Sequence, residues 1–147
     1  MKATIKQYVD YWIKLSNDSL LDMRAAYRSG RRTNALFCGH LAVEKMLKAL
    51  CAVRLVPSQE IWGHNLFKLA SSAGLWVHLS VAQQTELATI TTFNIEARYD
   101  DLKRQFAQLC TPQYAEKWVS VIETWVSHLK QQILKERVSL PNNVPAK

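Results

Sequence analysis

Ionisable side chains recur every four residues within the segment 37–49, where they alternate with apolar residues. Glu44 and Lys48 have the spacing and order that favour an ion pair on one helical face, in its simplest form a solvated pair. His40 lies four residues before Glu44, and such a pair can bind a metal ion, but no third ligand has a matching spacing. We therefore predict a structural polar role for His40 and Glu44, and no metal site.

His64 follows a loop and precedes a short predicted helix. At such a position an imidazole can cap the helix, order the loop, or contact a phosphate group. The structural role and the phosphate contact both stay open at this point.

Arg98 and Tyr99 are followed directly by two aspartates. A guanidinium is suited to bidentate contact with phosphate, and a tyrosine ring can stack on a base. Alternatively, Arg98 pairs with an internal carboxylate such as Glu44 and holds this segment against the helix. The sequence favours neither reading over the other.

The sequence marks no catalytic residue and indicates no cofactor. Its four glycines are too scattered to form a phosphate-binding loop. The three cysteines are odd in number and have no Cys-x-x-Cys spacing, so we predict neither a zinc site nor a disulfide framework. They favour a reducing, cytoplasmic location. The first residues lack the apolar core of a signal peptide, and no apolar run is long enough to span a membrane.

Length and charge limit the classes of protein further. A chain of 147 residues with 48% hydrophobic and 21% charged residues is typical of one folded domain. The net charge of +7 favours acidic partners such as nucleotides or nucleic acid. The basic residues are dispersed, however, so a basic tail that grips nucleic acid is not indicated.

Periodicity and capping signals predict an all-α fold, an up-and-down bundle of about five helices. Thr4 and Gln7 form a capping box at the start of the first helix, and Thr111 and Pro112 open the last one. The segment 95–110 mixes Arg, Tyr and Asp, and we expect irregular structure there. We predict a single domain over residues 1–138, followed by a flexible tail over residues 139–147. The expected helices cover about 5–29, 32–55, 65–72, 81–94 and 112–138.

Three of these pieces together resemble the HEPN domain family, small all-helical domains linked to nucleotide and RNA biology. They are the Ala-x-Glu-Lys-x-Leu-Lys-Ala helix of residues 42–49, the His-Asn-Leu step of residues 64–66, and the Ala-Arg-Tyr step of residues 97–99. The resemblance extends over residues 11–134. It implies a helical bundle, commonly a homodimer, and often a minimal nucleotidyltransferase as partner in toxin–antitoxin or defence systems.

Ribonuclease members of this family carry an Arg followed, after four to six residues, by a His. In such a pair the Arg stabilises phosphorane charge and the His moves a proton. Here no His follows Arg98 before His128. The resemblance therefore places this chain with the branches that lack the motif and act as binding or scaffolding domains.

Three hypotheses follow from these patterns. The first is a non-catalytic HEPN module that binds a nucleotide or a nucleotidyltransferase partner. The second is a metal-independent endoribonuclease in which Arg98 works with His64 or His40, and the third is a purely structural interaction domain. The predicted phosphate or nucleotide ligands are Lys45, Lys48, His64, Arg98 and Tyr99.

Overall fold

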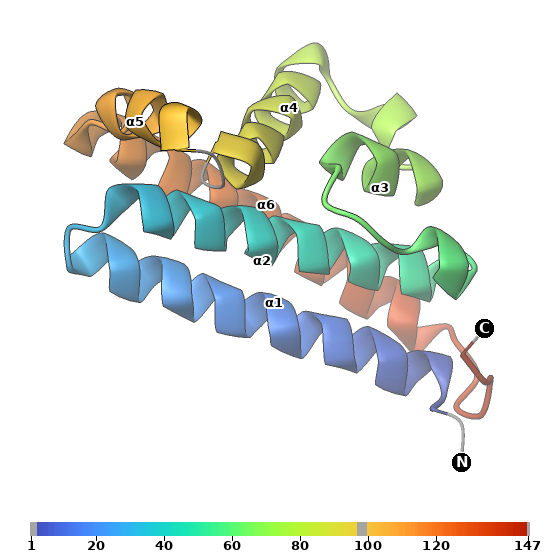
Figure 1. The fold of residues 1–147 in the computed structure, drawn as a ribbon. Coiled ribbons are helices and arrows are strands. Elements are labelled where there is room, and N and C mark those ends of the chain that lie inside the picture. The colour runs from blue at the N-terminus through green and yellow to red at the C-terminus, as the bar shows by residue number, and fades with distance from the viewer. Residues whose placement is uncertain (1–2, 97–99, 147) are drawn as a thin grey trace.

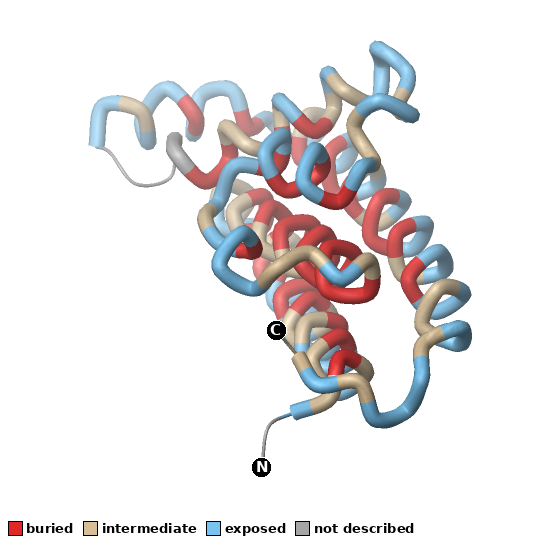
Figure 2. The backbone as a smooth tube through the Cα atoms, turned by 90° about the vertical axis from the view of Figure 1, so that its right-hand side faces the viewer, coloured by how far each residue is buried: buried red, intermediate tan, exposed pale blue. Residues whose placement is uncertain are grey.

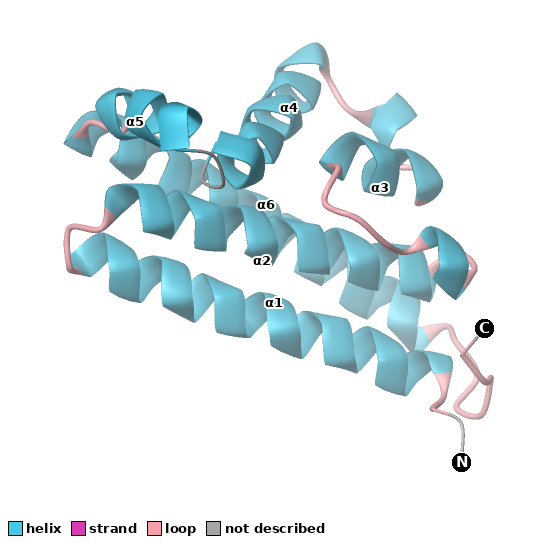
Figure 3. Cartoon of the chain, viewed as in Figure 1, coloured by secondary structure: helices cyan, strands magenta, loops and turns pink. Residues whose placement is uncertain are grey.

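The computed structural model describes residues 3–96 and 100–146, with the side chains of residues 95 and 96 left out of the description. Within that part of the chain it contains six α-helices and no strand (Figures 1 and 3). The predicted all-α class is confirmed, with one helix more than expected. The helices are α1 (Ile5–Arg28), α2 (Arg32–Val53), α3 (Leu66–Ser72), α4 (Val81–Glu96), α5 (Asp100–Leu109) and α6 (Pro112–Val138), and the 3-10 turns are η1 (Ser58–Glu60) and η2 (Trp76–His78).

Local signals in the sequence set several helix ends. The backbone amide of Gln7 donates to the Thr4 hydroxyl, and the Thr4 amide donates to the Gln7 side chain, so the predicted capping box is present. The Thr111 hydroxyl caps α6 in the same way. Gly30, with φ of 79°, provides the left-handed residue that lets the chain turn from α1 into α2.

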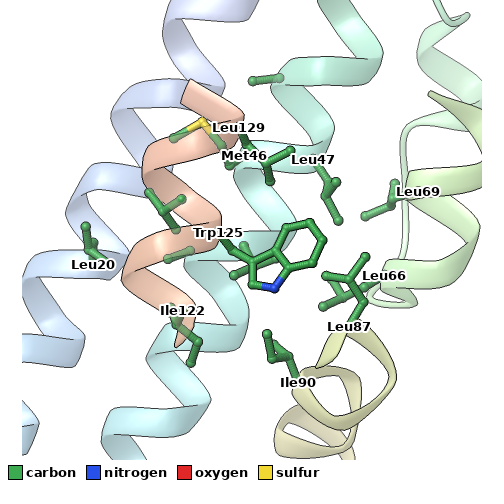
Figure 4. Packing of buried hydrophobic residues seen from close by; sticks show 14 of the residues in the cluster. Leu20, Met46, Leu47, Leu66, Leu69, Leu87, Ile90, Ile122, Trp125 and Leu129 are labelled. Atoms are coloured by element: carbon green, nitrogen blue, oxygen red, sulfur yellow. The ribbon is translucent and has the colours of Figure 1, made fainter. Parts of the chain in front are cut away.

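The central helix of the fold is α2. Helices α1 and α2 form an antiparallel hairpin, and α6 packs along α2 (Figure 1). The buried residues of these helices lie where they face one another (Figure 2). Trp125 of α6 sits among Leu47 of α2, Leu66 of α3, and Leu87 and Ile90 of α4, so it joins four helices in one core (Figure 4). Because α2 is covered on several sides, its polar residues His40, Glu44 and Lys48 are buried.

The expectation of irregular structure over residues 95–110 is wrong for the described residues, since α5 occupies most of that segment. Leu102 and Phe106, four residues apart, give α5 an apolar side, and Phe106 stacks on Phe93 with ring centroids 5.5 Å apart. Two aspartates in the first turn complement the helix dipole. The charged composition concealed this periodicity.

Residues 139–146, predicted to be a flexible tail, lie against the start of α1. The Ile5 amide donates to the Val144 carbonyl at 2.7 Å, and the Ala146 amide donates to the Ala3 carbonyl at 3.0 Å. The Lys6 ammonium donates to the Asn142 side chain. Flexibility of this segment stays a prediction, but these contacts connect the two ends of the domain.

Among the described residues, no helix combines the length and the apolar character that crossing a bilayer requires.

Candidate functional site

Four side chains meet around the carboxylate of Glu44, which is only 4% exposed. Its Oε1 lies 3.2 Å from His40 Nε2 and 2.7 Å from His64 Nδ1. The Lys48 ammonium donates to Oε2 at 3.2 Å. We call these four residues the Glu44 cluster; it combines one carboxylate, one ammonium and two imidazoles.

Two structural elements bring the cluster together. His40, Glu44 and Lys48 lie on one face of α2 because successive residues four apart stack on an α-helix. The loop after α2 then returns the chain to this face. Leu55 and Gly63, with φ of 62° and 87°, make the turns that this path needs. His64 ends the loop directly before α3.

Lys48 is held on both sides of its ammonium. Besides the bond to Glu44, its Nζ lies 5.1 Å from the centroid of the Trp12 ring of α1, a cation–π distance. The Lys48 side chain is 10% exposed. The predicted solvated form of the Glu44–Lys48 pair is therefore wrong, because α1 and the His64 loop cover this face of α2.

His40 is fully buried, and both of its ring nitrogens face oxygen atoms. Nδ1 lies 3.3 Å from the carbonyl oxygen of Ile90 in α4, and Nε2 faces Glu44. The structural polar role of His40 and Glu44 stays a prediction. The third ligand-type side chain that the spacing failed to indicate is His64, twenty residues after Glu44.

The structure brings together only some of the predicted phosphate ligands. Lys48 and His64 both contact Glu44, whereas the Lys45 ammonium donates to the Ser19 hydroxyl of α1 at 2.9 Å. Arg98 and Tyr99 lie outside the described residues. A phosphate at Lys48 and His64 would have to compete with the Glu44 carboxylate that both side chains already contact, and phosphate binding there stays a prediction.

A cleft of about 590 Å³ lies between α2, η2, the start of α4, and α6. Its lining includes apolar side chains such as Leu79 and Val121, and the exposed imidazoles of His78 and His128. The cleft could not be predicted from the sequence, because no spacing connects the two histidines. Amide and hydroxyl groups complete the lining, from Gln83, Ser120, Thr124 and Gln132.

Charged groups at the cleft are paired. The Trp125 indole donates to Glu86 at 3.1 Å, which ties α6 to α4. Arg54 binds Glu136 through two hydrogen bonds of 2.9 and 3.0 Å. These bonds lower the pKa of Glu136, and they raise the pKa of Arg54 although burial opposes that shift. The polar lining residues outside these bonds carry neutral groups and imidazoles.

Two of the cysteines are unsuited to act as nucleophiles. Burial raises the pKa of the Cys51 thiol to about 12, and Cys51 donates to the carbonyl of Leu69 at 3.4 Å. Burial raises the pKa of Cys38 as well. Both side chains are therefore thiols at neutral pH, whereas nucleophilic cysteines need the thiolate.

The HEPN domain model matches residues 9–132, which reach from α1 to the last turns of α6. The chain belongs to the HEPN domain family. Membership confirms the family resemblance and links the chain to the nucleotide and RNA biology of HEPN domains. Neither curated proteins nor solved structures include a significant match to it.

Proposed function

We propose that this chain is a non-catalytic HEPN module that binds a nucleotide, and that the cleft between η2, α4 and α6 is the binding site. The observation that carries the proposal is the cleft itself. Its volume of about 590 Å³ lies within the range of small-molecule sites, and it combines apolar side chains with a few polar groups. A base fits against Leu79 and Val121, where the amides of Gln83 and Gln132 can contact its edge.

The phosphates of the nucleotide would lie at the rim. His78 of η2 and His128 of α6 are exposed lining residues, and an imidazole can donate to a phosphate oxygen. The net charge of +7 adds a general attraction for anions. The absence of an Arg-x4-6-His motif after Arg98 supports binding rather than cleavage.

Calorimetry of the purified protein with a panel of nucleoside mono-, di- and triphosphates tests this proposal. Thr124→Trp places a large side chain inside the cleft and should abolish binding, whereas Ser127→Trp, on the same helix but outside the lining, should preserve it. Silence of the unmodified protein toward the whole panel would reject nucleotide binding. Binding that survives Thr124→Trp but not His64→Ala would move the site to the Glu44 cluster.

The family context adds a partner to the proposal. We propose that the chain forms a homodimer in the cytoplasm and works with a minimal nucleotidyltransferase, as in toxin–antitoxin or defence systems. Light scattering gives the oligomeric state, and co-purification with the product of a neighbouring nucleotidyltransferase gene tests the partner. The competing ribonuclease hypothesis predicts RNA cleavage in EDTA that disappears in Arg98→Ala.

A further inference from the structure

The Glu44 cluster contains the donor set of a metal site. His40 Nε2, Glu44 Oε1 and His64 Nδ1 all lie within 4.8 Å of one another. Two imidazole nitrogens and one carboxylate oxygen form a common ligand set for Zn²⁺ in sites with three protein ligands. The spacing within α2 alone offered two of the ligands, and the loop before α3 supplies the third.

The distances are close to those that a metal ion would impose. With bonds of about 2.0–2.1 Å in tetrahedral geometry, ligand atoms stand roughly 3.4 Å apart. Here Glu44 Oε1 is 3.2 Å from His40 Nε2 and 2.7 Å from His64 Nδ1. No two of the three ligand atoms are more than 4.8 Å apart, so small shifts of the His64 ring would bring all of them to this spacing. The loop position and the 46% exposure of the His64 side chain allow such shifts.

His40 is placed to act as a metal ligand. Its Nδ1 faces the Ile90 carbonyl at 3.3 Å, and its Nε2 faces the Glu44 carboxylate at 3.2 Å. Both contacts are favourable if Nδ1 donates to the carbonyl and Nε2 binds a cation beside the carboxylate.

The second layer of contacts also resembles that of a metal site. Metal-binding histidines usually donate their other ring N–H to a carbonyl or carboxylate, and the Ile90 carbonyl is in that position. Lys48 occupies Oε2 of Glu44, which leaves Oε1 as the oxygen that faces both imidazoles. Since His64 is half exposed, the fourth coordination position would be open to solvent.

We propose that His40, Glu44 and His64 bind a first-row divalent metal ion of the Zn²⁺ class at the junction of α2, the loop before α3, and α4. The site is separate from the cleft, because none of its residues lines that cavity. An open fourth position would let the metal accept a water molecule or an oxygen of a ligand.

The test uses Co²⁺ and Zn²⁺ with the full chain after treatment with EDTA and desalting. Co²⁺ bound by two imidazoles and a carboxylate in a tetrahedral site gives intense visible absorption, and Zn²⁺ should displace it at one equivalent. His64→Ala should weaken binding by at least the roughly 10- to 100-fold that loss of a second-layer partner costs. His78→Ala removes an exposed histidine elsewhere and is the matched control.

Circular dichroism shows whether His64→Ala keeps its helix content, which is expected because its side chain is half exposed. Absence of a tetrahedral Co²⁺ spectrum in the unmodified protein overturns the proposal. Equal binding by His64→Ala and the unmodified protein also overturns it, since the metal would then be bound elsewhere. Nucleotide calorimetry is independent of either result.

Discussion

The buried charge of Glu44 provides the sharpest test of the structural reasoning. Glu44→Gln keeps the volume of the side chain and removes its charge. The Lys48 ammonium, on a side chain only 10% exposed, then loses its carboxylate partner. Removing one member of a buried pair costs about 3–5 kcal/mol, because the remaining charge stays desolvated. That is a large share of the 5–15 kcal/mol by which domains are usually stable.

The assay is thermal and urea unfolding followed by circular dichroism, in EDTA so that bound metal does not contribute. For a domain of this size each kcal/mol shifts Tm by about 2–4 °C, so Glu44→Gln should lower Tm by roughly 6–20 °C. Asp18→Asn is the matched control, because Lys14 and Asp18 form another pair four residues apart at 3.1 Å. Their side chains are 74% and 54% exposed, and such pairs contribute about 0.3–0.5 kcal/mol.

A second comparison separates charge from packing. Lys48→Met combined with Glu44→Gln removes both members of the pair, and it should recover part of the stability that Glu44→Gln loses alone. The reasoning is refuted if the free energy of unfolding of Glu44→Gln lies within about 1 kcal/mol of that of the unmodified protein, which is the result expected for the exposed control. The carboxylate would then add no more than a surface pair does.

Two further predictions concern packing and pH. A Cβ at Gly39 would lie 2.5 Å from the Cδ1 atom of Ile122. Gly39→Ala should therefore lower the free energy of unfolding by up to about 2 kcal/mol, because overpacking exceeds the gain in helix propensity. The exposed Asn34→Ala is the control, and it should not lower the free energy of unfolding in urea. Arg54 lowers the pKa of Glu136, so the bond between them stabilises the fold at pH values above the ordinary carboxyl pKa of 4.5. This stabilisation is lost as the pH falls through the lowered pKa of Glu136. The stability gap between the unmodified protein and Glu136→Gln should therefore narrow in acid, and a gap that is constant with pH would contradict this origin.

Features that depend on neighbouring residues could be predicted from the sequence. The capping box of Thr4 and Gln7 needs only a hydroxyl and an amide three residues apart, and the structure contains it. Apolar residues recur at helical spacing in α2, and Leu36 and Leu47 among them are fully buried. Helix α5 could not be predicted in this way, because Phe106 is its one buried residue and most of the residues around it are polar or charged.

The state of Glu44 could not be predicted in this way. The Glu44–Lys48 pair is covered by Trp12 of α1, which lies beside Lys48 although it comes 36 positions earlier, and by His64, which a loop returns to α2. A spacing of four residues is the same for a solvated and a buried pair, so only the packing of α1 and α3 decides between them. The cleft could not be predicted for the same reason, because residues of η2 and α6 line one cavity only in the folded chain.

The Glu44 cluster and the cleft should respond separately to mutation. None of His40, Glu44, Lys48 and His64 lines the cleft, although Leu50 of the same helix does. Trp125 packs in the core among residues of α2, α3 and α4 (Figure 4), and its indole donates to Glu86. His64→Ala should therefore abolish metal binding and leave nucleotide affinity within a few-fold, while Thr124→Trp should do the reverse. Loss of both activities in His64→Ala would mean instead that the metal and the nucleotide share one site, with the open coordination position as their point of contact.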